Sequence, residues 1–172
     1  MGASASININ KDTLFDVFIS YPFCEECTVS YEIEKLESAL TQLDYKILNS
    51  YFTYNFINTN LGKENLIKIN SNIHPVLFTI PYIFICLSSK SISSVNQTLE
   101  LNNIANINPS NVTIIYLLIE EDFINESKVI IKKNKWFPFY DEETVFESIN
   151  KIITMLINNN NLYLSKLGSL IF

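Results

Sequence analysis

The side chain best placed to do chemistry in this sequence is an isolated carboxylate. Glu100 lies in the segment SVNQTLEL, and across residues 69–119 the only other Lys, Arg, Asp or Glu is Lys90. An ionised carboxylate is costly to desolvate, so a single acid among apolar segments is uncommon. A lone Glu on a helix is more often a solvated residue, and the asparagines that follow Glu100 fit that alternative. The charge-poor surroundings favour a functional acid.

Three cysteines are the other reactive side chains. Cys24 and Cys27 form a CxxC motif and Cys86 is distant, an odd count without framework spacing that indicates a reducing, cytoplasmic compartment. A zinc site needs a second pair of ligands, and the only histidine, His74, is far away in sequence. The two acids between Cys24 and Cys27 disfavour a reactive thiolate. We therefore expect neither a metal site nor redox chemistry.

The charge balance excludes several partners. The net charge is −6 and the chain has no arginine, so a surface for nucleic acid, which needs clustered cations, is not expected. The longest apolar stretch, residues 76–87, is too short to span a membrane and contains Pro81. The start MGASAS fits the N-myristoylation pattern, so a membrane is expected as a partner only if Gly2 is acylated.

Hydrophobic patterning predicts strands that alternate with helices. The strands are short apolar runs, and the helices carry apolar residues at helical spacing. With 172 residues and 48% hydrophobic residues, the chain can bury one core, so we expect an α/β fold with a parallel sheet and helices on both faces. The predicted strands are 16–21, 45–48, 82–87, 112–119 and 135–140, and the predicted helices are 31–43, a helix that starts at Gly62 and is limited by Pro75, 94–104 and 142–157.

The same patterning predicts three parts of the chain. Residues 1–14 are expected to form a flexible N-terminus, and residues 15–157 the folded domain. Four consecutive asparagines, Asn158 to Asn161, favour a polar linker. Residues 158–172 are therefore predicted to be this linker followed by the apolar tail LYLSKLGSLIF.

In parallel sheets, ligands bind outside the carboxyl ends of the strands. The predicted ends are Ser20-Tyr21, Asn49-Ser50, Leu87-Ser88 and Ile119-Glu120. Because the helix predicted to start at Ser94 follows the third of these ends, Glu100 can project from its first or second turn toward the same crevice.

Several classes of α/β protein are excluded by their chemistry. The chain contains three glycines, so it lacks both the GxGxxG motif of dinucleotide-binding folds and the phosphate-binding P-loop. The GxSxG motif of hydrolases is also absent. Phosphoacceptor domains carry acids where the first and third strands end, and here those positions are Ser20-Tyr21 and Leu87-Ser88.

Two segments resemble the Toll/interleukin-1 receptor (TIR) domain family. The run DVFISY resembles the family's first box, and FICLSSKSISSVNQTLEL resembles a later segment in which a strand ending in Leu-Ser is followed by a Ser, a Trp-Cys pair and a Glu-Leu. Asn96 and Gln97 take the place of the Trp-Cys pair, and Glu100 takes the place of the glutamate. Leu61-Gly62 matches the Pro-Gly that closes the family's BB loop. The resemblance spans about residues 15–157 and implies a flavodoxin-like sheet of five strands.

The resemblance also implies candidate residues. One branch of the family hydrolyses or cyclises NAD⁺ with the glutamate of that helix, so Glu100 is the candidate catalytic residue, with NAD⁺ as substrate and no cofactor. Aromatic rings in so aromatic a chain are more often packing residues than substrate contacts. The expected substrate-binding residues are Ser20, Tyr21, Phe23, Ser88 and Asn96, and the expected assembly loop contains Tyr51, Phe52, Tyr54, Phe56 and Gly62.

Two function classes stay open. The first is an NAD⁺ glycohydrolase or cyclase that requires self-association through TIR–TIR contacts. The second is a scaffold that works only by those contacts, in which the aromatic loop is adhesive and Glu100 has no catalytic role.

Overall fold

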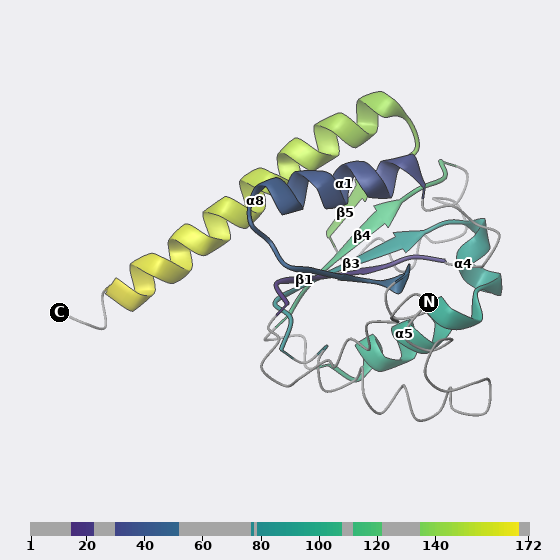
Figure 1. Cartoon of the computed structure of the whole chain (residues 1–172), viewed down its shortest axis with the longest axis horizontal. Helices are drawn as coiled ribbons and strands as arrows, with labels where there is room; N and C mark the ends of the chain where they lie inside the picture. Colours follow the sequence, from purple (N-terminus) through teal and green to yellow (C-terminus); the bar gives the residue numbers. More distant parts are fainter. Residues whose placement is uncertain are drawn as a thin grey trace, which may run out of the picture.

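The computed structural model describes residues 15–22, 30–51, 77, 79–107, 112–121 and 135–168, and of residues 92, 95, 96 and 160–168 it describes the backbone alone. Strands and helices alternate along most of the chain (Figure 1). The elements are β1 (Val17–Ser20), α1 (Tyr31–Gln42), β2 (Ile47–Asn49), β3 (Tyr82–Leu87), α4 (Ser89–Ser93), α5 (Val95–Ala105), β4 (Thr113–Leu118), β5 (Lys135–Pro138) and α8 (Glu142–Gly168).

The five strands form one parallel sheet in the order β2-β1-β3-β4-β5. This order is that of flavodoxin-like sheets, and the strand order reverses between β1 and β3. The predicted α/β fold class with five parallel strands is therefore confirmed. The point of reversal is where such folds leave a crevice at the carboxyl ends of their strands.

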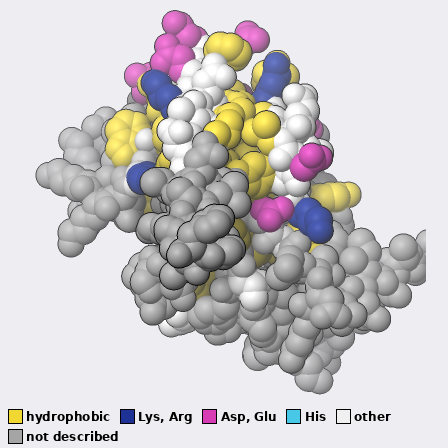
Figure 2. Space-filling model, turned by 90° about the vertical axis from the view of Figure 1, so that its left-hand side faces the viewer, with side chains coloured by type: hydrophobic (Ala, Val, Ile, Leu, Met, Phe, Trp, Pro, Cys, Tyr) yellow, Lys and Arg dark blue, Asp and Glu magenta, His cyan; other side chains and the backbone are white. Residues whose placement is uncertain are grey.

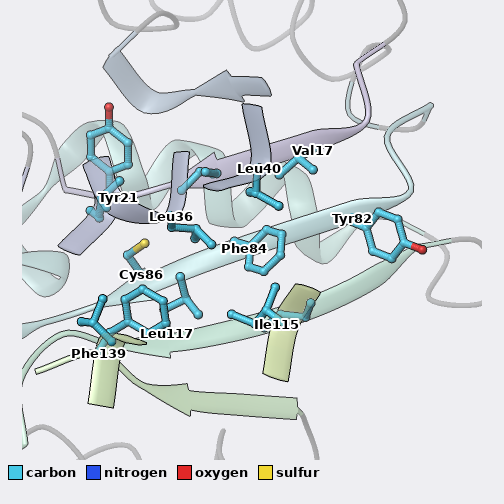
Figure 3. Packing of buried hydrophobic residues seen from close by; sticks show 14 of the residues in the cluster. Val17, Tyr21, Leu36, Leu40, Tyr82, Phe84, Cys86, Ile115, Leu117 and Phe139 are labelled. Atoms are coloured by element: carbon cyan, nitrogen blue, oxygen red, sulfur yellow. The ribbon is translucent and has the colours of Figure 1, made fainter. Parts of the chain in front are cut away.

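Helices cover both faces of the sheet (Figure 1). Helices α1 and α8 lie on one face, and α5 lies on the other. Each face has its own apolar cluster, because alternate residues of a strand point to opposite sides. All six residues of β3 are buried, as expected for a central strand covered on both faces. Figure 3 shows the cluster beneath α1 and α8.

Most predicted elements match the structure to within two residues at each end. The run 82–87 is correct at both ends, and Ser94 is the N-cap of α5, where its side chain accepts a hydrogen bond from the Gln97 backbone amide. The short helix α4 was not predicted. In α1 the buried residues are Ile33, Leu36 and Leu40, whereas Leu43 follows the end of the helix and is 40% exposed. The helix predicted to start at Gly62 lies outside the described residues.

Helix α8 corrects the predicted boundary at residue 158. It begins beside Asp141, whose carboxylate accepts a hydrogen bond from the Thr144 amide at 2.8 Å, and it continues through Asn158–Asn161 to Gly168. The prediction of a linker at these asparagines is therefore wrong. Asparagine disfavours a helix by only about 0.6 kcal/mol per residue, whereas glycine is a common terminator, and the first glycine after Asp141 is Gly168.

Candidate active site

Three buried polar side chains meet at the carboxyl end of the sheet. The hydroxyls of Ser20, at the end of β1, and Ser50, just after β2, both donate to Oε2 of Glu100 at 2.7 Å. Both serines are fully buried, and Glu100 is 4% exposed. Charge-assisted hydrogen bonds of this kind stabilise an ionised carboxylate in a buried setting. We call Ser20, Ser50 and Glu100 the carboxylate cluster.

The register of the sheet produces the carboxylate cluster. Ile19 pairs with Asn49, so the next residues, Ser20 and Ser50, lie side by side. Each follows a core residue of the α5 face by two positions, Phe18 in β1 and Leu48 in β2, and therefore points to that face. Glu100 reaches the same place from the second turn of α5.

Gln97 fixes α5 to the sheet one turn before Glu100. Its Nε2 donates to the carbonyl oxygens of Cys86 in β3, at 2.7 Å, and of Ser20 in β1, at 3.4 Å. Because carbonyl oxygens only accept, the amide nitrogen must face them. The opposite atom, Gln97 Oε1, is buried and has no hydrogen-bond partner among the described residues. The side chain thus joins β1 and β3 at the point where the strand order reverses.

Backbone donors determine which way the hydroxyl of Ser50 points. The amide of Tyr21 donates to Ser50 Oγ at 2.9 Å. A serine hydroxyl has one proton, and an amide N–H cannot accept it. The proton of Ser50 is therefore directed to Glu100, and the same oxygen links the end of β1 to the end of β2.

Carboxylates at this end of the sheet also affect their neighbours. Burial raises the pKa of the Tyr21 hydroxyl, and the charges of Glu37 and Glu100 raise it further. Burial likewise raises the pKa of the Cys86 thiol, with smaller contributions from the same two carboxylates. Cys86 is a free, buried thiol that these effects keep protonated.

Tyr21 does not lie where a substrate-binding residue was expected. Its ring is 1% exposed and belongs to the apolar cluster beneath α1, near Leu36 and Cys86 (Figure 3). Tyr21 directly follows Ser20, and successive residues of an extended chain point to opposite faces. The ring is therefore a core residue on the far face from Glu100, which corrects the expected substrate contact.

Besides Ser20 and Tyr21, Ser88 is the one predicted substrate-binding residue whose side chain is described. It is buried at the N-terminus of α4, where its amide donates to Ser91 Oγ at 3.0 Å. Within the described part of the chain, no hydrogen bond joins Ser88 to the carboxylate cluster. The side chain of Asn96 and the whole of Phe23 lie outside the described residues.

Only the first residue of the expected assembly loop is described. Tyr51 is 49% exposed, and its amide donates to the hydroxyl of Tyr21 at 3.3 Å. The remaining predicted loop residues lie outside the described residues: Phe52, Tyr54, Phe56 and Gly62.

The expected site did not include Ser50 and Gln97. Ser50 follows a predicted strand directly, and the same strand-end criterion that selected Ser20 would have selected it. Gln97 precedes Glu100 by three positions, which places both on one face of a helix. Both signals were present in the sequence, but the contacts of Ser50 depend on β2 lying beside β1, and those of Gln97 depend on β3 lying beside β1.

The amino end of the sheet offers a contrast. A hollow of about 320 Å³ there is lined by residues from β1, α1, β2 and α8 or their flanks: Asp16, Leu43, Asp44, Tyr45 and Ile157. Figure 2 views this end, where hydrophobic side chains reach the surface among charged ones. Within the described residues, no group of three or more His, Cys, Asp or Glu side chains is arranged to hold a metal ion.

No described helix has both the length and the apolar character needed to cross a membrane. Comparison of the chain with protein-family models, curated proteins and solved structures finds no significant match.

Proposed function

We propose that this chain is a TIR-like domain that cleaves the bond between nicotinamide and ribose in NAD⁺, with Glu100 as the catalytic carboxylate. The observation that carries the proposal is the carboxylate cluster: Glu100 is held by two serine hydroxyls at the carboxyl end of the sheet, beside the reversal of strand order. That place is the usual ligand site of such folds.

The chemistry needs little more than one positioned carboxylate. When the bond between ribose C1′ and the nicotinamide nitrogen breaks, its electron pair leaves with nicotinamide, and positive charge develops at C1′. A nearby carboxylate stabilises this oxocarbenium-like state, as in glycoside hydrolysis. Water then forms the new bond to C1′ and releases a proton, which completes hydrolysis. Attack by the adenine ring in place of water gives the cyclic product.

Nicotinamide leaves as a neutral molecule, so no paired acid is needed to protonate it. This agrees with a region of sequence in which Glu100 is the only carboxylate between residues 69 and 119. Self-association through the segment that begins at Tyr51 is the expected trigger, and the half-exposed ring of Tyr51 is available for such contacts.

The test is nicotinamide release from NAD⁺ at rising protein concentration, followed by nucleotide chromatography. Glu100→Gln keeps an acceptor for both serine hydroxyls and removes the charge, so we expect turnover to fall at least about 100-fold. Glu120→Gln is the matched control. Glu120 also follows a strand and accepts two hydrogen bonds from Ser89, at 2.8 and 3.1 Å, yet this variant should keep wild-type turnover.

Absence of nicotinamide at every protein concentration, or equal turnover by wild type and Glu100→Gln, would overturn the enzymatic proposal.

A second candidate function is a scaffold that assembles without catalysis. It is favoured by the burial of Glu100 and by its two hydroxyl partners, because a carboxylate shared by β1, β2 and α5 also serves to hold those elements together. A scaffold predicts that Glu100→Gln self-associates like wild type and that neither protein consumes NAD⁺. Sedimentation velocity beside the NAD⁺ assay separates the two functions.

A further inference from the structure

We propose that Ser50 is a positioning residue for Glu100, and that it links the carboxylate to the chain segment that leaves β2. This inference rests on the proposed function for its catalytic meaning. It concerns a residue that neither the sequence motifs nor the expected substrate contacts had selected.

Two serine hydroxyls orient the carboxylate of Glu100. Ser20 and Ser50 both donate to the same oxygen, Oε2, at 2.7 Å, and they approach from two different strands. Rotation of the carboxylate would lengthen both hydrogen bonds together. Loss of either hydroxyl removes one of these two hydrogen bonds to Oε2, so the carboxylate can turn away from the geometry that the reaction needs.

Ser50 is itself held by hydrogen bonds to Tyr21 that involve Ser50 and its neighbour Tyr51. Its hydroxyl accepts from the Tyr21 amide at 2.9 Å, and the amide of its neighbour Tyr51 donates to the Tyr21 hydroxyl at 3.3 Å. Two hydrogen bonds thus join residues 50 and 51 to Tyr21. They lie beyond Ile19 and Asn49, the last pair that β1 forms with β2.

Strand β2 is short and lies at the edge of the sheet. It has three residues, and among the described strands it pairs with β1 alone. A short edge strand resists displacement less than a central one. A movement of residues 50–51 therefore changes the position of Oε2, because the Ser50 hydroxyl is bonded to it. The contacts of Ser50 therefore make the position of this segment a determinant of the carboxylate's orientation.

The experiment compares Ser50→Ala with Ser50→Thr and with a matched control. The control, Ser148→Ala, removes another fully buried hydroxyl. Ser148 lies on α8, away from Glu100, and its hydroxyl donates to the Pro138 carbonyl of β5 at 2.8 Å. We expect Ser50→Ala to lower kcat at least about tenfold while KM changes by less than about threefold. Ser50→Thr, which keeps the hydroxyl, should restore most of kcat, and Ser148→Ala should leave kcat unchanged.

A merely structural role for Ser50 gives a different result. All three variants would then lose thermal stability without a selective loss of kcat, measured well below their melting temperatures. Wild-type kcat in Ser50→Ala, or equal losses in Ser50→Ala and Ser148→Ala, would overturn the inference.

A second measurement does not need activity. The melting temperatures of Ser50→Ala, Glu100→Ala, which removes the acceptor, and the double variant form a double-mutant cycle. If Ser50 holds Glu100, the melting temperature of the double variant falls by less than the sum of the decreases in the two single variants. An additive cycle overturns the inference even when NAD⁺ is cleaved. Non-additive shifts in a protein that does not cleave NAD⁺ overturn the proposed function and leave Ser50 as the residue that orients Glu100.

Discussion

The two faces of the sheet differ most at its carboxyl end. On the face of α1 and α8, Tyr21, Cys86 and Phe139 are buried in an apolar cluster. On the face of α5, the same end holds the carboxylate cluster and Gln97, all buried. Burying apolar side chains stabilises a fold, whereas burying polar ones costs free energy unless each is hydrogen-bonded. We call the face of α1 and α8 the apolar face and the face of α5 the polar face, after their side chains at this end of the sheet. The apolar face serves stability here, and the polar face retains groups that stability alone does not require.

The largest expected effect comes from breaking the apolar face. Phe139 follows β5 and is fully buried. Phe139→Ala should lower the free energy of unfolding by about 3–5 kcal/mol, because it removes apolar contacts and leaves a cavity. Denaturant unfolding followed by circular dichroism measures the change. Since Phe139 is on the other face from Glu100, nicotinamide release below the melting temperature should stay near the wild-type rate.

The matched control is Phe146→Ala on α8. Phe146 is 69% exposed, so its truncation should change the free energy of unfolding by no more than about 0.5 kcal/mol. Equal losses for Phe139→Ala and Phe146→Ala would show that the packing of this face has been assigned incorrectly.

A smaller effect is expected from breaking the polar face. Glu100→Ala removes the acceptor of two buried hydroxyls and should cost about 2 kcal/mol of unfolding free energy. Glu100→Gln keeps an acceptor oxygen and should cost about 1 kcal/mol. Urea unfolding of the two variants in parallel measures the difference. If both variants lost the same free energy of unfolding, the hydrogen bonds from the serine hydroxyls to Glu100 would contribute nothing to stability. The polar face would then have no hydrogen-bonded cluster of energetic consequence to set it apart from the apolar face.

The sequence predicted the framework that carries both faces. Residues 82–87 are apolar throughout, a pattern that few structures other than a strand covered on both faces accommodate. The predicted bounds of β3 were therefore correct at both ends. The helix that presents Glu100 was predicted because Ser94 is a suitable N-cap before an apolar repeat. Glu100 itself was selected by its isolation in sequence and by its place after a strand.

The contacts of the candidate site were harder to predict. The pairing of Ser50 with Glu100 depends on β2 lying beside β1, and strand order follows from long-range packing rather than from local pattern. Serine is also common in this sequence, so the type of residue 50 gave no signal of its own. Tyr21 was expected to contact the substrate because it lies at a strand end, but side chains alternate along a strand, and this alternation turns Tyr21 toward α1.

The smallest expected effect sharpens the comparison with a carboxylate on the other face. Glu37 of α1 accepts a hydrogen bond from the Asn49 side chain at 2.7 Å, and partial burial raises its pKa from 4.5. The charge of Glu34 raises this pKa further, whereas the hydrogen bond from Asn49 lowers it. The folded state thus binds the proton of Glu37 more tightly than the unfolded state does. The ionised side chain therefore lowers stability, an effect that is absent below about pH 4.5 and fully present above the raised pKa.

Glu37→Gln keeps the acceptor for Asn49 and removes this charge. It should raise the free energy of unfolding at pH 7 by less than about 1 kcal/mol, since solvent screens a partly exposed carboxylate, and by nothing at pH 4. Urea unfolding at pH 4, 5.5 and 7 measures the trend, and Glu34→Gln on the same helix is the control. A gain that is equal at pH 4 and pH 7 would contradict the prediction. Glu37 accepts from an amide, whereas Glu100 accepts from two buried hydroxyls. If Glu37→Gln raises the free energy of unfolding and Glu100→Gln lowers it, the fold tolerates the first carboxylate and holds the second in place.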